Sequence, residues 1–286
     1  MVKFSTKIHK KRDLLKVFLG YLEHNFIKRN KIKNELLVLN YHGVPENFLN
    51  NFNWQINYLI KNFSIISPSN AFNIFNGQEP KHYQPKILIT FDDGTKNILK
   101  AIEILDEKNI KSIIFIIPDF IDSIDQKKYY KKNIRPEINP NIENSDEDFS
   151  AISWDSLINL LKNNHHIGSH SLTHKMNNNN PKKVIENEII KSKKVIQNKL
   201  NIDVESFCSI NNSLLSINKY AIKKIKENYS FHFTTIAGNN IEKKPYSIKR
   251  INVEAFWTKY QFLFAIGKIE NFRWKRKRKK IDFLMD

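Results

Sequence analysis

The chain has 286 residues, and 41% of them are hydrophobic, including 20 Phe and 10 Tyr. This is enough apolar material for one large buried core, which excludes a wholly disordered chain. The formal net charge of +18 reflects Lys that is abundant along the whole sequence. A diffuse excess of this kind mainly solvates a surface, and no nucleic-acid-binding motif accompanies it, so a nucleic-acid partner is not expected.

Residues 1–34 form a basic segment with one apolar stretch, Leu14 to Leu22, which reads LLKVFLGYL. The stretch resembles the hydrophobic region of a signal peptide, but Lys16 interrupts it and polar residues follow from Glu23 where small residues would mark a cleavage site. It predicts instead an amphipathic helix of the kind that rests on a membrane surface. No apolar run reaches the roughly 20 residues that span a bilayer. The expected location is cytoplasmic, with peripheral membrane contact as the alternative.

From residue 35 onward, apolar runs of strand length alternate with segments of helical period. We expect strands at 36–40, 86–91, 112–117, 204–210, 230–235 and 247–253, and helices at 53–63, 98–105, 154–161, 182–200 and 219–226. This order predicts an α/β domain over 35–268 with parallel strands, either a barrel or an open sheet. In both architectures, chemistry collects beyond the C-terminal ends of the strands. Between 122 and 150 the pattern gives way to charge, Asn and Pro, which predicts an irregular insertion.

The last residues, 269–286, are expected to form a basic tail. Arg273 to Lys280 reads RWKRKRKK, a concentrated run of positive charge with one aromatic residue. Such a run is either a solvated segment or a contact for anionic lipid or an acidic polymer.

Two adjacent carboxylates, Asp92 and Asp93, directly follow the apolar strand at 86–91 and precede Gly94. Two close carboxylates do not both stay ionised without a counter-charge, and a divalent cation supplies one. One carboxylate then binds the metal while the other takes a proton from a bound water. The alternative is an ordinary helix N-cap, for which Asp is common.

His170 and His174 are separated by three residues, a spacing that lets two imidazoles reach one zinc ion. Chance spacing of surface histidines is the alternative. His165 and His166 are expected to be only the polar end of the preceding helix. With a carboxylate from another strand, His170 and His174 complete a set of three ligands with open positions, which is typical of a catalytic rather than a structural zinc site.

Thr90 to Gly94 (TFDDG) and His170 to His174 (HSLTH) resemble the first and second motifs of the polysaccharide deacetylases, the NodB-homology domain or carbohydrate esterase family 4. The resemblance extends through the Trp-bearing segment from Ile152, the Tyr41 to Val44 opening and the Arg250 to Val253 segment. It implies a distorted (β/α) barrel with fewer than eight strands, a deviant TIM barrel, and metal-dependent N-deacetylation of a glycan.

Residue by residue, the resemblance implies that Asp93, His170 and His174 hold a divalent metal, usually zinc. It makes Asp92 the general base. The implied substrate is an N-acetylhexosamine in a glycan or a glycan precursor. Removal of an O-acetyl group is the first alternative, and a silenced homologue that only binds glycan is the second.

The sequence departs from the family in two places. The third motif normally carries Pro or Gly and, in many relatives, an arginine that steadies the base; here Phe207 to Asn212 reads FCSINN. Arg250 is the candidate replacement, with an ordinary surface ion pair as the alternative. The late Leu-x-His motif that supplies the general acid is also absent, and His42 is the best replacement, with a structural histidine as the alternative. Cys208 lacks an identifiable activating partner, so it is not expected to act as a nucleophile.

Overall fold

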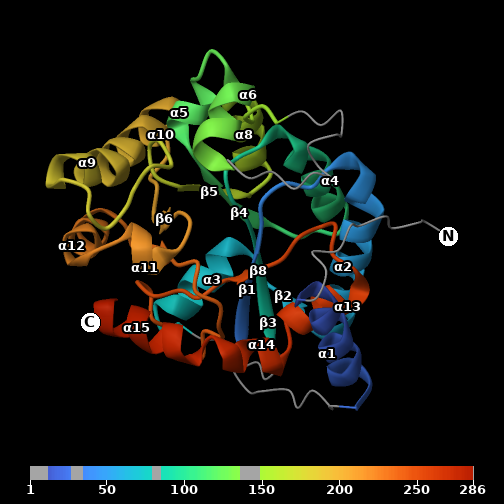
Figure 1. Ribbon diagram of the computed structural model, residues 1–286. Coiled ribbons are helices and arrows are strands. Elements are labelled where there is room, and N and C mark those ends of the chain that lie inside the picture. The colour runs from blue at the N-terminus through green and yellow to red at the C-terminus, as the bar shows by residue number, and fades with distance from the viewer. Residues whose placement is uncertain (1–11, 27–34, 79–84, 136–148, 286) are drawn as a thin grey trace.

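The computed structural model describes residues 12–26, 35–78, 85–135 and 149–285. Its centre is one sheet of parallel strands that curls into a barrel, in the order β7-β6-β5-β4-β3-β1-β8 (Figure 1). The strands are β1 (Leu36–Tyr41), β2 (Ser64–Ile65), β3 (Lys86–Phe91), β4 (Ser112–Ile116), β5 (His166–Ser169), β6 (Ser206–Cys208), β7 (Phe231–Phe233) and β8 (Ile251–Asn252). The short β2 pairs with the first half of β3, where β4 does not reach. The distorted barrel that the resemblance implied is confirmed.

The segment before β8 closes the barrel. Ile248 forms a parallel bridge with Phe233 of β7, and Ile251 then pairs with Leu39 of β1. This crossing carries Arg250, which lies between the two pairings, over the interior of the barrel. The last predicted strand is therefore present, but only Ile251–Asn252 is regular.

Helices surround the strands (Figure 1). They are α1 (Arg12–Phe26), α2 (Leu49–Asn62), α3 (Pro68–Phe75), α4 (Leu99–Glu107), α5 (Pro118–Ile121), α6 (Gln126–Tyr129), α8 (Trp154–Lys162), α9 (Lys182–Glu186), α10 (Ser192–Leu200), α11 (Ser213–Ser216), α12 (Lys219–Asn228), α13 (Lys259–Ala265), α14 (Lys268–Arg273) and α15 (Lys275–Met285). Two π-helical segments, η3 (Tyr130–Ile134) and η4 (Asn187–Lys191), continue α6 and join α9 to α10.

Side chains alternate between the interior of the barrel and its helix-covered outside, as the period of a strand requires. In β1, Leu36 and Val38 belong to an inner apolar cluster, whereas Leu37 and Leu39 belong to the large cluster under the helices. Helix α3 supplies several members of the inner cluster, and its Phe72 stacks on Phe231 at a centroid distance of 4.3 Å. Apolar side chains therefore fill the interior of the barrel away from the C-terminal ends of the strands. Those C-terminal ends are left for polar groups.

Gly168 of β5 shows how tightly the interior is packed. A Cβ atom at this position would lie 2.5 Å from the ring of Phe115 and 2.6 Å from Ser206 Oγ. Phe115 belongs to β4 and Ser206 to β6, the strands on either side of β5, and only glycine fits between them. Gly168 therefore allows Phe115 to fill the interior of the barrel below His170.

Most predicted elements are present with shifted bounds, and Ser153 caps α8 by accepting a hydrogen bond from Ser156 N. The prediction for His165 and His166 was wrong. His166 begins β5, and His165 is 1% exposed. Ser112 N donates to His165 Nδ1, and His165 Nε2 donates to Asp106 Oδ1 at 3.0 Å, so these partners satisfy the ring inside the protein. Of the irregular insertion predicted at 122–150, residues 136–148 lie outside the described residues.

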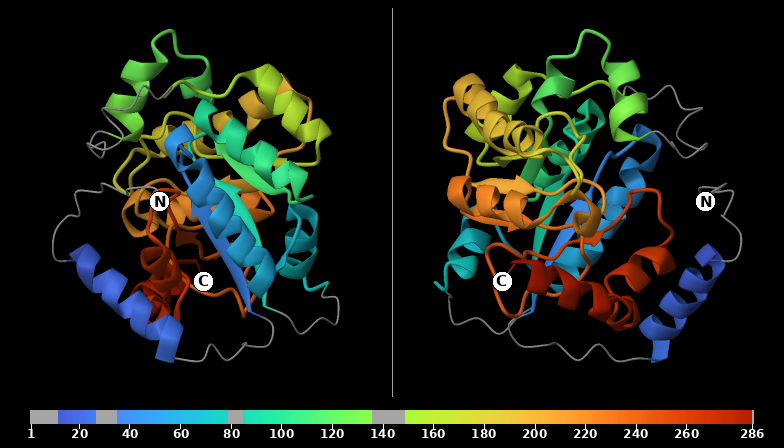
Figure 2. Two further views of the ribbon diagram at one scale, coloured as in Figure 1. Left: turned by 90° about the vertical axis from the view of Figure 1, so that its right-hand side faces the viewer. Right: turned by 60° about the vertical axis from the view of Figure 1, so that its left-hand side comes forward.

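Both ends of the described chain pack on the barrel as helices. Helix α1 lies along α13, where Tyr21 meets Tyr260 edge-on (Figure 2). The carboxylate of Glu23 accepts a hydrogen bond from Lys268 N at the start of α14. Residues 275–285 form α15, in which Ile281 and Met285 are buried. No helix in the described ranges is long and apolar enough to cross a membrane.

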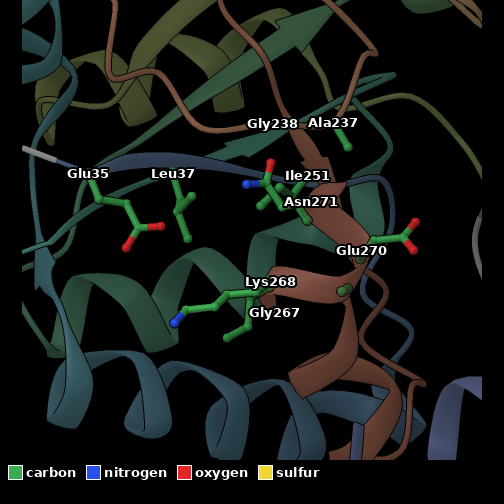
Figure 3. Close-up of a pocket in the computed structure, with 11 residues that line it drawn as sticks. Glu35, Leu37, Ala237, Gly238, Ile251, Gly267, Lys268, Glu270 and Asn271 are labelled. Carbon is green, nitrogen blue, oxygen red and sulfur yellow. The ribbon is translucent and has the colours of Figure 1, made fainter. Parts of the chain in front are cut away.

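Helix α14 fits closely against the barrel. A cavity of only about 20 Å³ remains there, lined by Leu37, Ile251, Lys268 and Asn271 among others (Figure 3). This is about the room of one water molecule, so the C-terminal helices belong to the packed body of the domain.

Candidate metal centre

The C-terminal ends of β3 and β5 bring three ligand-type side chains together. Asp93 follows β3, and His170 and His174 lie in the loop that follows β5. His170 Nε2 lies 3.6 Å from Asp93 Oδ1, and His174 Nε2 lies 3.8 Å from the same oxygen. All three side chains are buried, and their ligand atoms lie within 4.8 Å of one another.

Backbone carbonyls set the tautomers of both histidines. His170 Nδ1 lies 3.1 Å from Cys208 O, and His174 Nδ1 lies 3.0 Å from Asn133 O. A carbonyl oxygen only accepts, so each Nδ1 donates and each Nε2 carries a lone pair toward Asp93. Burial lowers the pKa of His170 to about 4, which keeps the ring neutral at pH 7.

The loops that carry these ligands hold unusual backbone conformations. Asp93, Ser171 and His174 have φ values of 68°, 66° and 63°, in the left-handed region that side chains with a Cβ rarely adopt. Gly94 follows with φ 68°, where glycine carries no such cost. Strained residues of this kind persist where the surrounding structure imposes them, and they cluster at functional sites.

Glu188 imposes the conformation of the histidine loop. This buried carboxylate accepts hydrogen bonds from Leu172 N at 3.1 Å and from Thr173 N and Oγ1. It lies in the π-helical segment η4, where one extra residue is inserted into the helix that follows the histidine loop. Glu188 was not predicted as a site residue, because nothing in the sequence of a long amphipathic helix distinguishes this acidic residue from its exposed neighbours.

Arg250 lies against Asp92, the second carboxylate after β3. Arg250 Nη1 donates to Asp92 Oδ1 at 2.7 Å, and Nη2 donates to Oδ2 at 2.8 Å. Burial by itself raises the pKa of Asp92, but Arg250 and then His170 outweigh it and hold that pKa well below its usual value. Arg250 is 2% exposed, so the alternative of an ordinary surface ion pair is wrong.

His42 follows β1 at the wall of the same cavity. Its Nδ1 lies 3.5 Å from Glu254 Oε1, and Arg135 Nη2 lies 3.8 Å from that oxygen. Burial raises the pKa of Glu254, but the contacts with His42 and Arg135 outweigh it and keep the pKa below its usual value. Glu254 and Arg135 are two further site residues that the sequence analysis missed.

An open cavity of about 480 Å³ joins these groups. Asp92, Asp93, His170 and His174 line it together with Arg250, His42 and Glu254, and with Asn40, Ile134, Arg135, Asn211, Thr235 and Asn252. Every residue that the sequence predicted for the site therefore faces one shared space.

Cys208 occupies the position of the altered third motif. Its Sγ lies 3.9 Å from Asp92 Oδ1, and Asp92, His170 and Cys208 also group closely enough to share an ion. Burial raises the pKa of this thiol well above its usual value, and the thiolate is the form that binds metal or attacks a substrate. The Cys208 thiol is thus inert, and the contribution of this residue to the site is its carbonyl, which orients His170.

The donor chemistry of Asp93, His170 and His174 fits a divalent cation. One carboxylate and two imidazoles with free Nε2 lone pairs are the ligand types of catalytic zinc sites, and the carbonyl partners behind the two rings are the usual outer support. In the described residues, this buried cluster is able to bind a divalent metal.

Residues 79–228 match the sequence profile described as polysaccharide deacetylase, and this range is just over half of the chain. The chain belongs to the polysaccharide deacetylase family. The comparison with curated proteins finds no significant match.

Several solved structures share the fold of this chain at low sequence identity. The deacetylase PplD of Streptococcus pyogenes, solved in complex with acetate, is 16% identical with a TM-score of 0.59, over 78% of this chain and 93% of that chain. IcaB from Ammonifex degensii is 16% identical with a TM-score of 0.62, over 80% and 94%. A de-N-acetylase from Aggregatibacter actinomycetemcomitans is 16% identical with a TM-score of 0.58, over 81% and 100%. At this identity the likeness concerns the fold.

Proposed function

We propose that this polysaccharide deacetylase is a metal-dependent hydrolase that removes the N-acetyl group from an N-acetylhexosamine in a glycan or a glycan precursor. The observation that carries the proposal is the arrangement of Asp92 beside the Asp93–His170–His174 cluster. One carboxylate joins the ligand set, while Arg250 holds the other and keeps it outside. The description of one structural relative as a de-N-acetylase supports the same reaction.

Asp92 is the general base in this proposal. Asp93, His170 and His174 would hold a divalent cation, most simply zinc, which would supply Lewis-acid polarisation of the acetyl carbonyl and lower the pKa of the attacking water. Asp92 accepts a proton from this water as the water attacks the carbonyl carbon. Arg250 keeps Asp92 ionised and fixes both of its oxygens, so the carboxylate is already oriented when the substrate arrives.

His42 is the general acid in this proposal. An amine is too basic to leave as an anion, so the nitrogen must receive a proton as the C–N bond breaks. His42 lines the cavity from the strand next to β3, and Glu254 lies against its Nδ1. That contact leaves Nε2 to donate the proton to the nitrogen, and acetate and a free amine are the products.

The test is acetate release from N-acetylglucosamine oligomers by protein loaded with zinc. Asp92→Asn is the informative variant because it removes the base and leaves the three ligands in place. We expect turnover by the wild type, loss of turnover in the variant, and equal zinc content in both. A wild-type protein that holds zinc and releases no acetate from any acetylated glycan contradicts the proposal.

Parallel substrates separate the two alternatives. Faster turnover of O-acetylated xylan or peptidoglycan than of the matched N-acetyl glycan identifies an O-acetyl esterase. Glycan binding that is unchanged in an Asp92→Ala variant, without turnover of any substrate, identifies a silenced homologue.

A further inference from the structure

Exposed apolar side chains gather on the outer side of α1. Leu14, Leu15 and Phe18 are 54%, 55% and 56% exposed, respectively. The opposite side of the helix packs on the domain, where Gly20 approaches the backbone of Tyr260 and Glu23 binds the start of α14. Helix α1 thus contacts the domain through Gly20 and Glu23 on one side and presents three large apolar side chains outward on the other. This is the reverse of a helix that covers a core.

The outer side of α15 is basic. Its inner side is held by Asp282, which binds Lys249 Nζ and Ser247 Oγ at 2.7 Å each, and by Arg278, which donates to Ala237 O. The exposed side carries Lys275, Arg276, Lys279 and Lys280. Phe283, one turn further along the same side, is 78% exposed. The basic run is therefore a fixed, one-sided array of charge with an aromatic residue at its end.

A cationic cavity lies between these two helices. Its volume is about 330 Å³, and Lys16, Arg273, Lys277, two indole rings and the carboxylate of Glu270 line it. Glu270 pairs with Arg273 and accepts from Trp274 Nε1, which leaves an excess of positive charge around the cavity. Lys277 Nζ lies 4.2 Å from the centre of the Trp274 ring, and Lys16 Nζ lies 5.8 Å from that of Trp257. Figure 1 shows α15, α14 and α1 in succession along one edge of the molecule. We call this edge, with the outer sides of α1 and α15 and the cavity between them, the basal face.

We propose that the basal face docks on the surface of a bilayer that contains anionic phospholipid. The aliphatic and aromatic residues of α1 enter the boundary of the acyl chains, as in helices that lie in a membrane interface. The cations of α15 meet the negative headgroups, and the cavity with its two tryptophans takes a lipid phosphate at the depth where such rings are enriched.

The chemistry of the basal face disfavours other partners. A second copy of the chain would place the basic side of α15 against positive charge, which repels at short range. An acidic polymer uses the cations but leaves Leu14, Leu15 and Phe18 in water. An anionic bilayer matches both the charge and the apolar residues. The inference is independent of the reaction at the metal centre, because the side chains of α1 and α15 that carry it lie outside the catalytic cavity. Among the described residues, Asn252 alone lines both cavities.

The test is co-sedimentation of the full chain with two kinds of vesicle. One contains phosphatidylcholine alone, and the other is mixed with phosphatidylglycerol to about 30% as an anionic lipid. We expect binding only to the anionic vesicles, and weaker binding at high salt because of screening. Two variants probe the two components. Arg276→Gln/Lys279→Gln/Lys280→Gln removes three cations, and at roughly fivefold per cation we expect an affinity loss of roughly 100-fold. Leu15→Asp/Phe18→Asp is expected to weaken binding at least about tenfold.

Matched controls lie at the opposite edge of the molecule, where Figure 1 places α6. Lys127→Gln/Lys128→Gln/Lys131→Gln removes the same charge from exposed positions, and Ile124→Asp removes an apolar residue that is fully exposed. Both controls are expected to bind vesicles as the wild type does. Circular dichroism and thermal midpoints establish that every variant is folded.

Several outcomes overturn the proposal. Equal losses in the basal and control variants show a nonspecific effect of charge. Binding to polyphosphate or heparin that survives Leu15→Asp/Phe18→Asp, with no binding to vesicles, assigns the face to an acidic polymer. Dimerisation that Leu15→Asp/Phe18→Asp abolishes, again without vesicle binding, assigns it to a second copy of the chain.

Discussion

The guanidinium of Arg250 donates hydrogen bonds to both carboxylate oxygens of Asp92 inside the barrel, at 2.7 and 2.8 Å. The two residues are 158 positions apart in the sequence. They meet because the segment before β8 crosses from β7 to β1 and passes the end of β3. The altered third motif lacks the arginine that the resemblance led us to expect, and Arg250 holds Asp92 from the segment before β8 instead.

Loss of this pair is expected to destabilise the protein and to shift its pH profile. Arg250→Met leaves a buried carboxylate without its cation, which costs about 3–5 kcal/mol of unfolding free energy. Burial then raises the pKa of Asp92 with only His170 and His42 left to oppose it. The acid limb of the pH–rate profile, which in the wild type is held at low pH, therefore moves upward. Urea unfolding and the pH dependence of acetate release measure the two effects.

A double-mutant cycle separates the Arg250–Asp92 pair from general damage. Asp92→Asn/Arg250→Met removes both charges and is expected to recover part of the stability that Arg250→Met loses. Additive losses in the double variant contradict a coupled pair. Arg250→Lys keeps the positive charge but loses the planar guanidinium that binds both oxygens. Its unfolding free energy is expected to lie between those of the wild type and Arg250→Met.

Glu188 is expected to control metal affinity without touching the metal. Glu188→Gln replaces an acceptor-only carboxylate that holds Leu172 N, Thr173 N and the Thr173 hydroxyl. The histidine loop loses its fixed shape, and we expect zinc to bind about 10–100-fold more weakly. Competition with a fluorescent chelator measures this. Glu186→Gln, in the same helix but bound to Tyr220 on the outside, is the matched control. Equal zinc affinity in Glu188→Gln and Glu186→Gln contradicts the role of Glu188 in metal binding.

His42→Ala is expected to slow amide hydrolysis far more than ester hydrolysis. The amine leaving group needs the proton that His42 donates, whereas an alcohol leaves more readily. We expect a loss of about 10²–10⁴-fold in kcat for an N-acetyl substrate. The loss for an activated acetyl ester is expected to be small, with zinc content unchanged. A similar loss on both substrates identifies His42 as a binding or structural residue instead.

The metal-free protein is expected to lose stability as the pH falls from about 6.5 to about 4. His232 is buried, accepts from Ser209 Oγ and donates to Tyr246 O, and burial lowers its pKa to about 4. The unfolded chain therefore takes up this proton first. The contribution of His232 is complete above about pH 6.5 and is lost progressively down to about pH 4, by about 3 kcal/mol in total.

His170 acts in the same direction, because its pKa is also lowered to about 4. Urea unfolding at several pH values measures the combined slope. His232→Gln is expected to make this slope shallower, and His24→Gln, which removes an exposed imidazole, is the matched control. An unchanged slope in His232→Gln contradicts this account.

Much of the centre was predictable from local pattern. A short apolar run, followed at once by Asp92, places that carboxylate at the C-terminal end of a parallel strand, where the barrel opens. The spacing of His170 and His174 needs only one loop to bring both rings to one point. These are short-range relations, and the physics of strands and loops decides them with few alternatives.

His165 shows where local pattern fails. A pair of histidines after a helix is typical of an exposed polar end. The side chain is buried all the same, because Ser112 and Asp106 from neighbouring elements satisfy both ring nitrogens. The cost of burying a polar ring depends on partners that sequence position does not reveal.

The sequence by itself determined the alternating α/β pattern and the two local motifs of the candidate metal centre, Asp92-Asp93 and His170 with His174, since each depends on residues close together in the chain. Only the tertiary structure decided that Arg250 holds Asp92, that Glu188 shapes the histidine loop and that Glu254 lies against His42. Each of these contacts joins separate strands or loops. Closure of the barrel selects one partner for each buried charge from many residues of the same type, and the energy that enforces the choice is the cost of leaving that charge unpaired.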